Sequence, residues 1–80
     1  MHRIQPLKPH KLIKALQKAG FKVIRQRGSH IILMHEEKRI RIVIPVHPSK
    51  DVKVGLVRAI IREAKLSREE FLKLLKEFSL

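Results

Sequence analysis

The sequence predicts a small α+β fold, in which an antiparallel sheet of three strands is covered by helices on one face. A chain of 80 residues is long enough for one small domain and its hydrophobic core. Apolar residues recur at β spacing in the middle of the chain and at helical spacing towards both ends. We therefore expect a single domain over residues 1–80, with an N-terminal arm over residues 1–9 and the element order α-β-β-β-α-α.

The first predicted helix follows the arm, in the stretch HKLIKALQKAG. One face is apolar and the opposite stripe is basic. The apolar residues are Leu12, Ile13, Leu16 and Ala19, and the basic ones are Lys11, Lys14 and Lys18. Gly20 stands where a helix commonly ends. A lysine stripe is by default a solvated surface, and its alternative role is phosphate binding.

Three β segments come next, in FKVIRQRG, SHIILMH and RIRIVIP. Gly28 marks the turn between the first two, where a glycine tolerates positive φ, and Pro45 ends the third. The register of the second hairpin decides which face His30 occupies, because side chains alternate faces along a strand.

A two-residue turn at Glu36 and Glu37 pairs His35 with Lys38. It also pairs Leu33 with Ile40, Ile31 with Ile42, and Ser29 with Ile44. The other face then carries His30, Ile32, Met34, Arg39, Arg41 and Val43. A three-residue turn would instead bury His30 against the isoleucines. We favour the two-residue turn because it keeps arginines out of the core.

Two helices complete the predicted fold. Ser49 or Asp51 is a suitable N-cap for a helix over roughly residues 52–65. Its inward residues are Val57, Ile60, Ile61 and Ala64, and its outward ones are Arg58, Arg62 and Lys65. The sequence SREE is a capping box, in which Ser67 and Glu70 satisfy each other's amide groups. It opens a last helix whose apolar residues are Phe71, Leu74, Leu75 and Phe78.

Charge is the strongest feature of the composition. Nineteen Lys and Arg against seven Asp and Glu give a net charge of +12, which favours a polyanionic partner: nucleic acid, an anionic membrane or an acidic protein. With three aromatic residues in the chain, a base-stacking platform is not expected. Cysteines are absent, which excludes disulfides and thiolate metal sites. No stretch is apolar enough for a membrane span or a signal peptide, so we expect a cytoplasmic protein with no membrane partner.

Several motifs occur together along the chain. A basic helix ending in AGF is followed by RQRGSH, then IPVHP, then GLVRAIIREA and LSREEFL. In this ordered set the chain resembles the HicA (YcfA-like) family of toxins from HicAB toxin–antitoxin systems. The resemblance implies a double-stranded-RNA-binding-like fold, ribosome-independent cleavage of mRNA, and sequestration by a HicB-type antitoxin. It also implies that His30, the histidine of GSH, is the catalytic residue.

The residues fit that chemistry. Cleavage of RNA needs a base for the 2′-hydroxyl proton, a proton donor for the leaving 5′-oxygen, and positive charge near the phosphate. An imidazole can perform either proton transfer at neutral pH, and arginines supply the charge. The candidate phosphate-binding residues are Arg25, Arg27, Gly28, Ser29, Arg39 and Arg41. No spacing indicates a metal site, and the hypothesis requires no metal, cofactor or small-molecule ligand.

Alternatives remain for these residues. Taken alone, His30 is an ordinary surface histidine of a strand, and His47 is either a structural loop residue or a second acid/base. We expect His2, His10 and His35 to be solvent-exposed. Arg58, Arg62 and Lys65 are solvated, bind phosphate or contact the antitoxin. The alternative functions are a non-catalytic RNA- or DNA-binding module, and a protein whose charge serves to dock an acidic partner.

Overall fold

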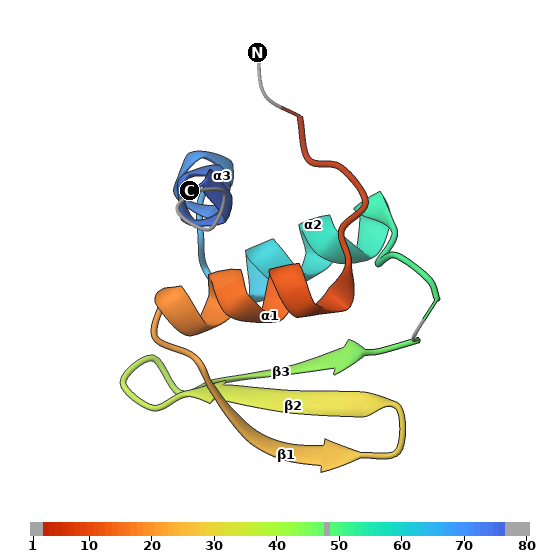
Figure 1. The fold of residues 1–80 in the computed structure, drawn as a ribbon. Coiled ribbons are helices and arrows are strands. Elements are labelled where there is room, and N and C mark those ends of the chain that lie inside the picture. The colour runs from red at the N-terminus through yellow and green to blue at the C-terminus, as the bar shows by residue number, and fades with distance from the viewer. Residues whose placement is uncertain (1–2, 48, 77–80) are drawn as a thin grey trace.

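The computed structural model describes residues 3–47 and 49–76, and its elements follow the order α-β-β-β-α-α (Figure 1). These are α1 (Pro9–Lys18), β1 (Lys22–Arg27), β2 (His30–His35), β3 (Ile40–Pro45), α2 (Val54–Glu63) and α3 (Arg68–Lys76). The strands form an antiparallel sheet in the order β1-β2-β3. The predicted fold class is confirmed.

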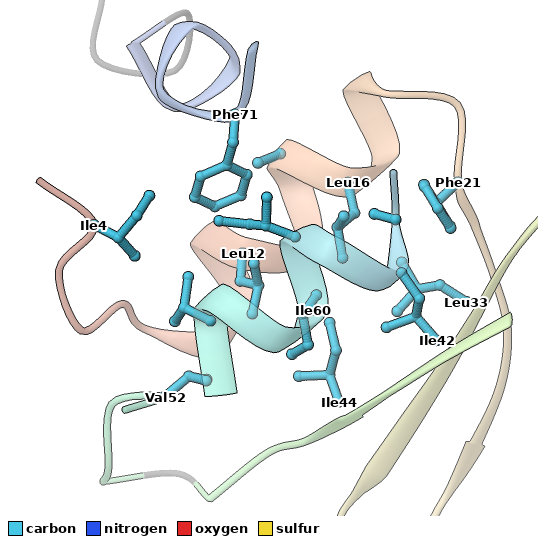
Figure 2. Packing of buried hydrophobic residues seen from close by; sticks show 14 residues of the cluster. Ile4, Leu12, Leu16, Phe21, Leu33, Ile42, Ile44, Val52, Ile60 and Phe71 are labelled. Carbon is cyan, nitrogen blue, oxygen red and sulfur yellow. The ribbon is translucent and has the colours of Figure 1, made fainter. Parts of the chain in front are cut away.

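The helices all lie on one side of the sheet (Figure 1). α1 and α2 are next to the strands, and α3 packs on the far side of that helical layer. The core lies between these layers and includes Leu12, Leu16, Phe21, Leu33, Ile42, Ile44, Ile60 and Phe71 (Figure 2). Within the described residues, no helix or strand covers the other face of the sheet (Figure 1).

Helices α1 and α2 bury the faces that their periodicity predicts. In α2, Val57, Ile60 and Ile61 are buried, and so is Ala64 just beyond its end. In α1 the buried residues are Leu12, Ala15 and Leu16. Ile13 and Ala19 are half-buried at the border of the core.

The start of α2 differs from the prediction. The helix begins at Val54, and its N-cap residue is Lys53, which makes no side-chain capping bond, so neither Ser49 nor Asp51 caps it. Val52 does not join the helix because its backbone pairs with Leu7: the Leu7 amide donates to the Val52 carbonyl (3.1 Å) and the Val52 amide to the Leu7 carbonyl (2.6 Å). The side chain of Val52 is buried in this extended arrangement.

The described part of the N-terminal arm is therefore built into the fold. Ile4 is buried in the core cluster, and Leu7 packs against the same cluster while it pairs with Val52. Lys8 at the end of the arm lies 3.7 Å from a carboxylate oxygen of Asp51. The arm thus tethers the loop before α2 to the start of α1.

The predicted capping box at the start of α3 is confirmed. The Ser67 amide donates to Oε1 of Glu70 (2.9 Å), and the Glu70 amide donates to the Ser67 hydroxyl (3.0 Å). These bonds hold the pKa of Glu70 below its usual value, since they favour the charged carboxylate. Phe71 is fully buried in the next turn. Phe78 and His2 lie outside the described residues.

The turn of the second hairpin was predicted wrongly, although the faces were predicted correctly. The loop is four residues long, 36–39, and the pairs are Leu33 with Ile42 and Ile31 with Ile44. Arg39 closes this loop with φ 56°, and its amide donates to the Glu36 carbonyl (3.2 Å). Because the pairing differs from the expected one by two residues, each side chain keeps its face.

His35 is half-buried, not exposed as expected. Its ring packs edge-on against Phe21, with centroids 5.2 Å apart. Its Nδ1 accepts a hydrogen bond from the Lys38 amide (3.2 Å). Gly20, in the left-handed region at φ 102°, passes so close that a Cβ there would lie 2.7 Å from Nε2 of His35. The imidazole thus contacts both the β2–β3 loop, through Lys38, and the end of α1, at Gly20.

Candidate nucleic-acid interface

The uncovered face of the sheet brings His30 next to basic side chains. Residues that pair directly across antiparallel strands share a face, with Cβ atoms about 5 Å apart. Three rows of residues cross the uncovered face: Arg27, His30 and Pro45; Arg25, Ile32 and Val43; and Lys22, Met34 and Arg41. His30 itself is exposed, as the favoured register predicted. We call these nine residues the open face.

A β-bulge puts the arginines of β1 on the open face. The register between β1 and β2 shifts by one residue between Val23 and Arg25. Without this shift, the pairing of Val23 with Leu33 would continue along the strand and place Arg25 and Arg27 on the helix-covered face. The extra residue turns the side chains of the following part of the strand to the opposite face, as bulges commonly do. Arg27 consequently stands directly opposite His30.

The positive charge of the open face is not neutralised within the described chain. Arg25, Arg27 and Arg41 are exposed, and no described carboxylate lies within 4 Å of their guanidinium groups. Side chains of one sign on one surface raise the local concentration of anions. The electrostatics of this face therefore suit a phosphate-bearing ligand.

Apolar side chains lie among these charges. Ile32 is only 5% exposed although it belongs to the open face, where it is flanked by Arg25 and Val43. Val43 is 43% exposed, and Ile24, at the bulge, is 55% exposed. The arginines thus border an apolar centre.

The β1–β2 turn lies at the same end of the sheet as His30. Gly28 has φ 60° and no atom within 4 Å of the position that an added Cβ would take, so another chain can approach its backbone on that side. The Ser29 carbonyl accepts a hydrogen bond from the Val46 amide (2.6 Å), which extends the β2–β3 pairing past Pro45.

His47 follows this extension and is exposed. Val46 packs against the core cluster. β3 ends at Pro45, and the His47 carbonyl accepts a hydrogen bond from the Lys50 amide (3.0 Å), so His47 begins the turn that follows the strand. His47 stands two residues past Pro45, the residue that pairs with His30, so it follows the same end of the sheet.

Other predicted site residues lie elsewhere. Arg39 is in the β2–β3 loop, at the opposite end of the sheet from His30. The lysines of α1 are exposed on the helical layer, whereas His30 is on the far side of the sheet. The structure therefore groups His30 with Arg25, Arg27 and the turn. It adds Lys22, which the sequence analysis missed because the bulge is not visible in the pattern.

The described chain offers neither a metal cluster nor a membrane span. Among the described residues, no group of three or more His, Asp or Glu side chains is arranged to hold a metal ion. None of the helices in this part of the chain is both long and apolar enough to cross a membrane.

Fold and site together define a small basic α+β protein with an exposed histidine beside arginines on an uncovered sheet. Residues 9–66 match the family described as "HicA toxin of bacterial toxin-antitoxin". The chain thus belongs to the HicA toxin family, as its motifs indicated. The matched span includes both hairpins and α2 and ends just before α3. A comparison with curated proteins found no match.

Proposed function

We propose that this toxin is an endoribonuclease that cleaves mRNA in the cytoplasm by a metal-independent, histidine-dependent transesterification. The observation that carries the proposal is the position of His30, exposed on the open face and directly opposite Arg27. Membership of a toxin family supports a damaging activity, and the charge of +12 supports a polyanionic substrate.

In the proposed reaction, the imidazole of His30 takes the proton of a ribose 2′-hydroxyl. The 2′-oxygen then attacks the adjacent phosphorus, and the bond from phosphorus to the 5′-oxygen breaks. The products are a 2′,3′-cyclic phosphate and a 5′-hydroxyl. Arg25 and Arg27 stabilise the charge that builds on the phosphate oxygens, and the open backbone at Gly28 and Ser29 positions the phosphate.

The leaving 5′-oxygen needs a proton, and His47 is the residue that we propose to supply it. The support for this proposal is that His47 stands two residues past Pro45, the partner of His30 across the strands; continued alternation would give it the face of His30, at a diagonal spacing with room for a phosphodiester between two imidazoles. A general base and a general acid that act together give a bell-shaped dependence of rate on pH. Replacement of His47 by Ala is expected to remove the fall in rate at high pH, which reports the proton donor. The rise in rate at low pH, which reports His30 as the base, should stay.

A HicB-type antitoxin is the proposed inhibitor. The family is described as the toxin of bacterial toxin–antitoxin systems, and a protein that carries twelve net positive charges pairs favourably with an acidic partner. Val43 on the open face and Ile24 at the bulge are exposed, and they give such a partner apolar surface to bury.

The test compares wild type with His30→Ala in cells and in purified form. We expect wild type to stop growth and degrade mRNA, and the variant to do neither while it binds RNA with unchanged affinity. His10→Ala is the matched control, because His10 is exposed at the start of α1 and far from the open face. If wild type and His30→Ala bind RNA equally and both leave it intact, the protein is a non-catalytic nucleic-acid-binding module.

A further inference from the structure

A second cluster of arginines lies on the helical side of the molecule. Arg58 and Arg62 of α2 and Arg68 of α3 line one shallow cleft of about 350 Å³. The cleft is also lined by Ile4, Ile61 and Glu69. Figure 2 shows Ile4 on the side of the helical layer towards α3, away from the strands. The cleft is therefore separate from the open face and from His30.

The charge of this cleft is only partly compensated. No described carboxylate lies within 4 Å of any of the three guanidinium groups, and Glu69, the one acidic residue of the lining, leaves two net positive charges. Arg58 and Arg62 are one helical turn apart, a spacing at which like charges destabilise a helix. An anion in the cleft would remove that repulsion.

The first turn of α3 adds hydrogen-bond donors at the same place. The capping box engages the amides of Ser67 and Glu70, and the Phe71 amide donates to the Ser67 carbonyl. Arg68 and Glu69 line the cleft. Their backbone amides belong to the first turn of α3, where the helix itself offers no carbonyl acceptor. Such amides and the helix dipole favour a negative charge.

We propose that this cleft binds a phosphate group of the RNA backbone, in a tract other than the one that His30 cleaves. Guanidinium groups from two helices, together with backbone amides, suit a tetrahedral group with several oxygens, and arginine forks bind phosphate in a bidentate way. The assignment to RNA rests on the proposed function, whereas the assignment to phosphate rests on the cleft alone. RNA that reaches the cleft passes round the molecule from the open face, so a long RNA gains from the cleft and a short one does not.

Binding of phosphate is tested first, by NMR. Sodium phosphate is titrated into the wild-type chain at constant ionic strength, with sodium chloride as the control salt. We expect phosphate to shift the side-chain Nε signals of Arg58, Arg62 and Arg68 and the amide signals of Arg68 and Glu69. If phosphate moves none of them, or chloride moves them as much, the phosphate site is refuted. If a glutamate-rich peptide shifts them and phosphate does not, the cleft is a docking site for acidic protein instead.

The source of the phosphate is tested with the double variant Arg58→Gln/Arg62→Gln. Its matched control is Lys50→Gln/Lys76→Gln, which removes the same charge from exposed positions outside the cleft. For an RNA of about 30 nucleotides, we expect the cleft variant to bind about tenfold more weakly and to lose about 0.7 from the slope of log affinity against log salt, as for one lost phosphate contact. Cleavage of a hexanucleotide should stay at the wild-type rate.

An equal loss of long-RNA affinity in the control variant would overturn the RNA assignment, because charge alone would then explain it. Cleavage is not needed for either binding measurement. A wild-type chain that binds phosphate in the cleft but never cuts RNA would contradict the proposed function and leave the cleft assignment standing.

Discussion

The contact between Gly20 and His35 gives a prediction whose size follows from the structure. Gly20→Ala places a Cβ 2.7 Å from Nε2 of His35, at a residue with φ 102°. A left-handed conformation costs a non-glycine residue about 1–2 kcal/mol. His35 must also move, which weakens its hydrogen bond with the Lys38 amide and its packing on Phe21, each worth about 1 kcal/mol.

We therefore expect Gly20→Ala to lower the free energy of unfolding by about 3 kcal/mol, from a total of about 4–12 kcal/mol for a domain of this size. The melting temperature should fall by roughly 15 °C, measured by circular dichroism and by denaturant titration. Gly28→Ala is the matched control, since Gly28 has φ 60° and no atom within 4 Å of an added Cβ. It should cost only the backbone term of about 1–2 kcal/mol.

The part of the loss that comes from the overlap is separated by a double-mutant cycle. In a His35→Ala background, Gly20→Ala should cost about as much as Gly28→Ala does in the wild type, because the overlapping ring is gone. Equal losses for Gly20→Ala with and without the ring would refute the close approach of His35 to the end of α1.

Three further changes test other parts of the fold. Ser67→Ala should cost about 1 kcal/mol, because it removes the hydroxyl that accepts a hydrogen bond from the Glu70 amide; Ser67→Thr should restore most of the loss, and a neutral effect of the alanine would contradict the capping box. The folded-state pKa of Glu70 is lowered, mainly by the Ser67 amide, so its contribution to stability is present above its unfolded pKa near 4.5 and is lost as the pH falls through the lower, folded value. The difference in unfolding free energy between wild type and Glu70→Gln should therefore be largest near neutral pH and shrink under acid titration; a difference that does not depend on pH would contradict this. Ile4→Ala should cost about 2–4 kcal/mol as a core truncation, and an unchanged melting temperature would show that the arm does not belong to the core.

Local patterns predicted much of this fold. The inward residues of α2, the Ser67–Glu70 capping box and the positive φ of Gly28 each depend on neighbours within a few residues. The face of His30 was also predictable, because the alternation of strand side chains survives any change of register by two residues.

The features that the sequence did not reveal depend on contacts between distant segments. Val52 leaves α2 because Leu7 pairs with it, and His35 is half-buried because Phe21 and Gly20 lie against it. In the candidate site, the bulge after Val23 turns Arg25 and Arg27 towards His30. A strict alternation along β1 would have separated them from it.

The chemical ends of the RNA products test the central proposal most directly. Purified wild type is incubated with RNA in EDTA, beside His30→Ala and His10→Ala. The account predicts fragments that end in 2′,3′-cyclic phosphate and 5′-hydroxyl groups, formed equally by wild type and His10→Ala and at least 100-fold more slowly by His30→Ala, as for loss of a general base. Fragments with 3′-hydroxyl ends, or cleavage by His30→Ala at the wild-type rate, would contradict it.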